Sequence, residues 1–181
     1  MDADVLKIAV PLALAALAGL SLLMSVIFNV TGTWERVPED GQPTGGVPER
    51  LALGQFGPFV RGRREVPGGW QEYSGMMWGR SLKLARRDFG VDALKRQHFP
   101  DVLAQKLSGD VFAELRLNLT QGGTALEGTF TPQKIDFLLA PPRITQRYWL
   151  PPVARAYRRV SAVELEEGRR VAVPVKDVEP A

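Results

Sequence analysis

Mostly apolar residues form a long run near the amino terminus, from Ile8 to Val30, with no charged residue among them. A helix of these 23 residues would extend roughly 34 Å, because each helical residue rises about 1.5 Å. That length covers the hydrocarbon core of a bilayer, which is about 30 Å thick. Pro11 lies near the start of the run, where a proline disturbs a helix least. The pattern therefore predicts a transmembrane helix, with residues 1–30 forming an N-terminal anchor.

A cleaved secretory signal is the alternative interpretation of this run. Signal peptides begin with basic residues and carry an apolar stretch of roughly 7–15 residues before a cleavage site. Here Asp2 and Asp4 outnumber Lys7, and the apolar residues continue well past Ala18, which ends a small-residue motif resembling a cleavage site. These features favour a retained anchor. The absence of cysteine excludes a lipoprotein anchor.

The charges that flank the run determine its expected orientation. Basic residues next to a span favour the cytoplasm, whereas acidic residues contribute little. Lys7 and the amino terminus lie on one side of the run, and Arg36 lies on the other. The small excess on the amino-terminal side predicts a single-pass protein whose C-terminal domain is extracytoplasmic.

Small residues gather on one face of the expected helix. Such residues allow two membrane helices to approach closely, and a serine can donate a hydrogen bond across the interface. This face predicts contact with other membrane-protein subunits, although the same residues would also serve as apolar filler against lipid. The candidates for helix–helix contact are Ala15, Ala18, Gly19, Leu22 and Ser25.

Beyond the apolar run, the period of the pattern changes to two. Apolar residues occupy every second position of Ala113–Thr120, and the alternation resumes in Ala125–Thr131 after Gly122 and Gly123. Two glycines between alternating runs favour a tight hairpin, because they tolerate the positive φ of its turn. Both faces agree in one register, which pairs leucines with apolar residues and polar residues with polar ones. We therefore expect an antiparallel hairpin with a shared buried face, made of Leu115, Leu117, Leu119, Leu126 and Phe130.

Several shorter runs with strand-forming residues complete the pattern. The expected strands are Phe59–Arg64, Trp70–Met77, Ser81–Arg87, Lys134–Leu139, Ile144–Leu150, Arg155–Val160 and the edge segment Val171–Val173. Val91–Ser108 differs, since Pro100 and Asp101 can open a helix and Gly109 can end it. We expect one or two short helices there, inserted among the strands.

The predicted fold is mainly β, an antiparallel barrel or sandwich with a short helical insert, preceded by one transmembrane helix. Residues 31–50 read as a linker, rich in proline and glycine, with a first strand within Gly32–Val37. Residues 51–175 form the β-rich domain and residues 176–181 a tail.

One motif resembles a known family. Gly32-Thr33-Trp34 opens the β-rich part, and Arg158 and Arg159 lie near its end. This arrangement is similar to that of the lipocalins, in which a G-x-W on the first strand packs beneath an arginine from the closing region. The resemblance implies a barrel that carries an apolar ligand, although the helical insert in mid-chain departs from the lipocalin pattern. The alternative is that Trp34 lies at a membrane interface just beyond the span.

Charge argues against a nucleic-acid partner. The chain has 23 Lys+Arg against 20 Asp+Glu, a formal net charge of +3. Basic pairs such as Arg63-Arg64 and Arg86-Arg87 have acidic neighbours, whereas nucleic-acid binders usually concentrate positive charge on one stripe with aromatic residues. Solvated strand faces, or attraction to anionic lipid headgroups, explain the pairs more simply.

The inventory of reactive residues is short. His98 is the single histidine and there is no cysteine, which removes thiol nucleophiles and centres with several histidine ligands. Acidic groups such as Glu166-Glu167, or Glu35 with Glu39-Asp40, are expected to be solvated, and Gly54–Gly57 lacks the lysine of a phosphate loop. We therefore predict no catalytic, cofactor-binding or metal-binding residues, and no enzymatic activity.

One aromatic and methionine-rich cluster stands out as a ligand or docking site. Such residues line apolar pockets and protein-docking faces, although they also serve in the ordinary packing of a small β domain. The cluster consists of Trp70, Tyr73, Met76, Met77 and Trp78.

Together these features predict a membrane-anchored accessory or scaffolding subunit of a membrane protein complex. The alternative is a membrane-tethered, lipocalin-like carrier or sensor of an apolar ligand such as a lipid.

Overall fold

The computed structural model describes residues 3–38, 48–120 and 122–161, without the side chains of residues 3–8, 21, 22, 24 and 25. In chain order the elements are α1 (Ala3–Ile27), β1 (Gly32–Val37), β2 (Arg50–Phe56), β3 (Phe59–Val66), β4 (Gly69–Trp78), β5 (Ser81–Phe89), α2 (Val91–Arg96), α3 (Asp101–Leu107), β6 (Val111–Leu119), β7 (Ala125–Leu139), β8 (Pro142–Trp149) and β9 (Val153–Val160).

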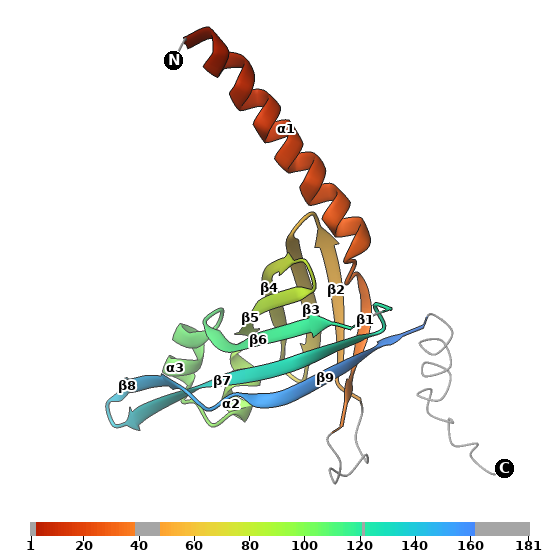
Figure 1. The fold of residues 1–181 in the computed structure, drawn as a ribbon. Coiled ribbons are helices and arrows are strands. Elements are labelled where there is room, and N and C mark those ends of the chain that lie inside the picture. The colour runs from red at the N-terminus through yellow and green to blue at the C-terminus, as the bar shows by residue number, and fades with distance from the viewer. Residues whose placement is uncertain (1–2, 39–47, 121, 162–181) are drawn as a thin grey trace, which may run out of the picture.

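The strands close into a barrel. Antiparallel pairing joins each strand from β1 to β7 to the next one along the chain. Strand β9 then pairs with both β7 and β1, so that eight strands form a closed ring (Figure 1). The mainly β fold with a small helical part is thus confirmed, and of the two expected architectures the barrel is the one observed. Closure removes the exposed strand edges that a sandwich would leave.

Helix α1 has 25 residues and extends away from one end of the barrel (Figure 1). Among the described residues, no helix has the combination of length and apolar character needed to cross a bilayer, so the structure does not support the expected transmembrane helix.

The predicted hairpin is confirmed in its register. Strands β6 and β7 pair Leu119 with Leu126 and Leu115 with Phe130, while Asn118 faces Glu127. Four of the five residues expected on the shared face are buried, and Phe130 is half-buried against the same core. Strict alternation therefore identified both the strands and the face that turns inward.

The other strands differ from expectation in three ways. The sequence did not predict β2, because Gly54 interrupts a short run of apolar residues. Lys134–Leu139 is the second half of the long strand β7 and not a separate strand. Val171–Val173 lies outside the described residues. The remaining expected strands correspond to β1, β3, β4, β5, β8 and β9.

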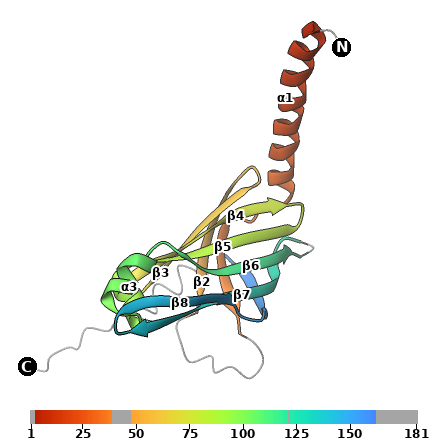
Figure 2. The same cartoon turned by 90° about the vertical axis from the view of Figure 1, so that its left-hand side faces the viewer.

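The second half of β7 leaves the barrel and pairs with β8, which makes a hairpin that projects beyond the ring beside α3 (Figure 2). Helices α2 and α3 occupy the expected insert, and they pack with this hairpin to form a second core. The fully buried members of that core include Leu94 and Leu107. The two helices and the projecting hairpin thus support each other at the barrel end opposite α1.

Candidate apolar site at the helix end of the barrel

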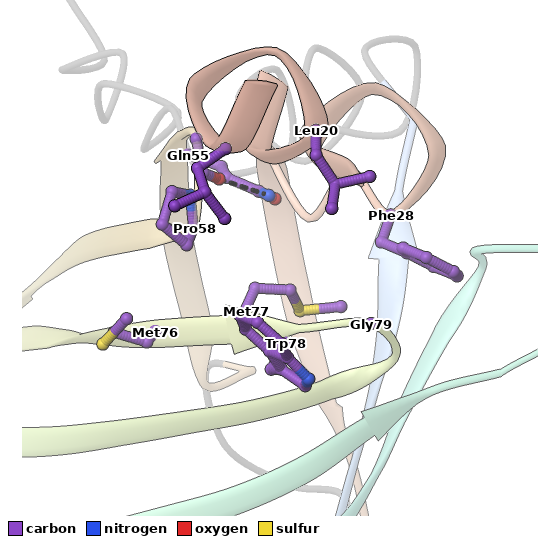
Figure 3. Close-up of a pocket in the computed structure, with 10 residues that line it drawn as sticks. Leu20, Phe28, Gln55, Pro58, Met76, Met77, Trp78 and Gly79 are labelled. Carbon is purple, nitrogen blue, oxygen red and sulfur yellow. Dashed lines mark hydrogen bonds between the residues drawn. The ribbon is translucent and has the colours of Figure 1, made fainter. Parts of the chain in front are cut away.

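An apolar pocket of about 430 Å³ lies where α1 meets the rim of the barrel. Its walls come from α1, from the β2–β3 turn and from the end of β4. Figure 3 shows Leu20 extending from the helix toward the strand that carries Met77, with Phe28 to one side. The residues that line it are Leu17, Leu20, Phe28, Gln55, Gly57, Pro58, Met76, Met77, Trp78 and Gly79.

Gln55 is the polar side chain of this pocket, and its amide is already engaged. Its Nε2 donates a hydrogen bond to the Gly57 carbonyl at 3.0 Å, and its Oε1 accepts one from the Val30 amide at 3.0 Å. The backbone amide of Gln55 donates to the Thr31 hydroxyl at 3.1 Å. These bonds tie the segment between α1 and β1 to the end of β2. Because the Gln55 amide is engaged in these bonds, the pocket is suited to an apolar group.

Alternation along β4 distributes the predicted aromatic and methionine cluster over two faces. Met77 points inward and is 4 % exposed, whereas Trp78 is 82 % exposed on the outside. Met76 also lies on the outer face, and Gly79 turns the chain directly after Trp78 with a φ of 57°. The pocket therefore brings together the last three residues of the cluster.

The other two members of the cluster lie elsewhere. Trp70 stacks on Phe89 at a centroid distance of 5.3 Å, at the opposite end of β4, with the Arg63 guanidinium 4.8 Å from its ring centre. Tyr73 is buried inside the barrel, where its hydroxyl donates to Gln71 at 3.2 Å. Burial raises the pKa of Tyr73 above its ordinary value. These two residues stabilise the barrel and do not line the pocket.

Trp34 seals the barrel end beneath the pocket. It is fully buried, and its Nε1 donates to the Val30 carbonyl at 2.8 Å. The guanidinium of Arg159 lies 4.8 Å from the centre of the indole ring and also donates to the Asn29 carbonyl. The first and last strands of the ring thus clamp the segment that follows α1.

A layer of charged residues, which the sequence analysis missed, lies inside the other half of the barrel. The carboxylate of Glu49 forms ion pairs with Arg64 at 3.3 Å and with Arg155 at 3.4 Å. The Tyr157 hydroxyl donates to the same carboxylate at 3.4 Å. Burial, with a smaller contribution from the Glu49 charge, raises the pKa of Tyr157. Arg155 and Tyr157 occupy alternate positions of β9. This alternation is the sequence signal that could have predicted that both side chains point into the barrel.

The remaining candidates do not assemble into a reactive site. His98 lies in the exposed turn after α2. Glu35 is bound by Arg50 at 2.9 Å and by Arg158 at 2.8 Å, which links β1 to both of its neighbouring strands. In the part of the chain that the structure describes, no group of three or more metal-ligating side chains lies together. Glu39-Asp40 and Glu166-Glu167 lie outside the described residues.

The small-residue face of α1 lies on the side of the helix away from the pocket. With 3.6 residues per turn, Ala18 and Gly19 point nearly opposite to Leu17 and Leu20, which line the pocket. A Cβ built on Gly19 would meet no atom within 4 Å, so this side is open. Ala15 is exposed in the same way, while the side chains of residues 22 and 25 lie outside the description.

Comparison with known proteins gives no relative: no family model, curated protein or solved structure matches the chain.

Proposed function

We propose that this protein is a single-pass, membrane-anchored accessory subunit, in which α1 is inserted in a bilayer and presents the barrel at its surface. The observation that carries the proposal is the apolar surface of α1. Its large apolar side chains are between 48 % and 76 % exposed from Val10 to Ile27, wherever the structure describes them. An apolar surface of this extent is stable when lipid or another protein covers it. The sequence supports the proposal as well: the charge-free run from Ile8 to Val30, which includes residues whose side chains the structure does not describe, has the length that a bilayer requires.

The junction between α1 and the barrel supports the same proposal. Only four residues, 28–31, separate the helix from β1. Val30 is buried, and Trp34 and Gln55 hold its carbonyl and its amide. A connection that is both short and fixed would keep the barrel at the membrane surface.

The open, small-residue face of α1 favours a helix from another subunit as the partner. We expect Gly19→Ile to abolish co-purification of that subunit while the protein stays in the membrane, because the larger side chain prevents close helix approach. The space around Gly19 means that the substitution does not disturb this chain itself. Pull-down from detergent-solubilised membranes measures the effect.

The matched control for this variant is Ala13→Ile, on the opposite face of α1. It should co-purify with the partner like the natural protein. Normal assembly of Gly19→Ile would show that this face contacts lipid alone.

The orientation proposed from the flanking charges places the barrel outside the cytoplasm. In a bacterial host, protease added to intact spheroplasts should then digest the chain beyond Val37. Immunodetection of the barrel, with a cytoplasmic protein as the lysis control, measures this. Protection until the cells are lysed would reverse the orientation.

A tethered carrier of an apolar ligand is the second candidate. It is favoured by the pocket beside Met77 and by the Trp34–Arg159 packing, the arrangement that the lipocalin resemblance implies. Native mass spectrometry of the detergent-extracted protein separates the two functions. Bound protein subunits support the accessory role, whereas a bound lipid with no protein partner supports the carrier and contradicts the accessory role.

A further inference from the structure

The rim of the barrel nearest α1 carries a patch of exposed apolar side chains. Trp78 is 82 % exposed, Phe56 80 %, Phe59 58 % and Met76 49 %. They lie on the outer face of three neighbouring strands, and the register places Phe59 directly between Phe56 and Met76. These four residues, which we call the rim patch, are therefore continuous.

The position of the rim patch distinguishes it from the rest of the outer surface. Two of its members, Met76 and Trp78, also line the pocket against Leu17 and Leu20 of α1. Further along β3 toward the other end, the outward residues are charged, as at Arg61, Arg63 and Glu65. Apolar exposure on these strands is thus concentrated where α1 joins the barrel.

Positive charge borders the rim patch. Lys83 pairs across the strands with Met76, Arg80 follows Trp78 in the β4–β5 turn, and Arg61 lies two residues beyond Phe59. Among the described residues these three cations form no ion pair. Aromatic residues flanked by unpaired cations are the combination that binds the interface of a membrane with anionic lipids.

We propose that the rim patch is a lipid-contacting surface, immersed in the interfacial layer of the bilayer that holds α1, with Arg61, Arg80 and Lys83 at the level of the lipid phosphates. This inference rests on the proposed membrane insertion of α1, because the end of the helix determines which end of the barrel faces the lipid. The apolar pocket between α1 and the rim of the barrel then receives part of an acyl chain. A bilayer suits this surface better than a protein does, because the patch is continuous with the apolar helix and its flanking cations form no ion pair within the part of the chain that the structure describes.

The natural chain contains no cysteine, so single-cysteine variants permit a direct test. Phe59→Cys and Met76→Cys report on the rim patch, and Leu139→Cys is the matched control. Leu139 is also an exposed apolar residue, 71 % accessible, but it lies at the tip of the β7–β8 hairpin. Each full-length variant is spin-labelled and reconstituted into phosphatidylcholine vesicles with and without phosphatidylglycerol. Collision rates with oxygen and with a water-soluble nickel chelate are then compared.

The inference predicts a ratio of oxygen to nickel collisions that is several-fold higher at Phe59 and Met76 than at Leu139. Adding Arg80→Glu and Lys83→Glu should reduce this difference in the vesicles that contain phosphatidylglycerol. Equal nickel accessibility at all three positions would overturn the inference. Labels that are exposed in vesicles but shielded in native membranes would identify a protein interface instead.

An alkaline wash of the same vesicles separates this inference from the proposed function. If the protein stays with the vesicles but its rim labels collide freely with the nickel chelate, α1 is inserted and only the rim inference is contradicted. Protein that the wash removes contradicts the membrane insertion of α1, and the rim inference with it.

Discussion

Replacing Trp34 by alanine is expected to lower the free energy of unfolding of the barrel by about 3–5 kcal/mol. The indole is fully buried in the main core and fills the barrel end beneath α1. Its removal leaves a cavity that the closed ring of strands cannot collapse to fill. It also removes the hydrogen bond to the Val30 carbonyl and the aromatic surface beneath Arg159.

Guanidinium denaturation in detergent, followed by far-ultraviolet circular dichroism, measures this effect. Trp78→Ala is the matched control, because the same side chain is lost from a position that is 82 % exposed. We expect a change within about 0.5 kcal/mol for the control. Equal midpoints for the two variants would contradict the assignment of Trp34 to the core.

The second large effect is expected for Leu117→Ala, which should cost about 2–5 kcal/mol. Leu117 lies on the inward face of β6, between β5 and β7, and is 1 % exposed. The surrounding core residues come from several strands, so local relaxation cannot fill the space that the leucine leaves.

Asn118→Ala is the control for this variant, since it changes the next residue of the same strand on the outer face. Its denaturation midpoint should stay close to that of the natural protein. An unchanged midpoint for Leu117→Ala would show that the inward face of β6 has been assigned incorrectly.

The β6–β7 hairpin could be predicted from the sequence because the information that specifies it is local. Alternation over Ala113–Thr120 and the glycine pair at Gly122 and Gly123 fix both the turn and the register within a short segment. Closure of the ring could not be predicted in this way. Arg159 binds the carbonyl of Asn29 across 130 positions of the chain, and no local pattern encodes that contact.

The inner charged layer was missed for a different reason. Arginine in a strand usually indicates a solvated face, and β9 carries arginine on both of its faces. The side chain of Arg155 is 11 % exposed and pairs at 3.4 Å with Glu49, from the segment before β2. Only the closed barrel reveals which of the arginines lie inside.

The candidate site was predicted in part. The cluster on β4 contained three of the residues that line the pocket, Met76, Met77 and Trp78. The expected strand ended at Met77, so the sequence did not place Trp78 on the face opposite to Met77. Nor could it show that Leu17 and Leu20 of α1 complete the wall. The approach of the helix to the rim depends on the bond that the Val30 amide donates to Gln55, which joins residues 25 positions apart.

Alkaline carbonate extraction of membranes from cells that express the full chain tests the central claim most directly. If α1 is inserted in the bilayer, the protein remains at full length in the membrane pellet, because high pH releases proteins held only at the surface and leaves inserted helices in place. Recovery of the protein in the supernatant would contradict the membrane-anchored account.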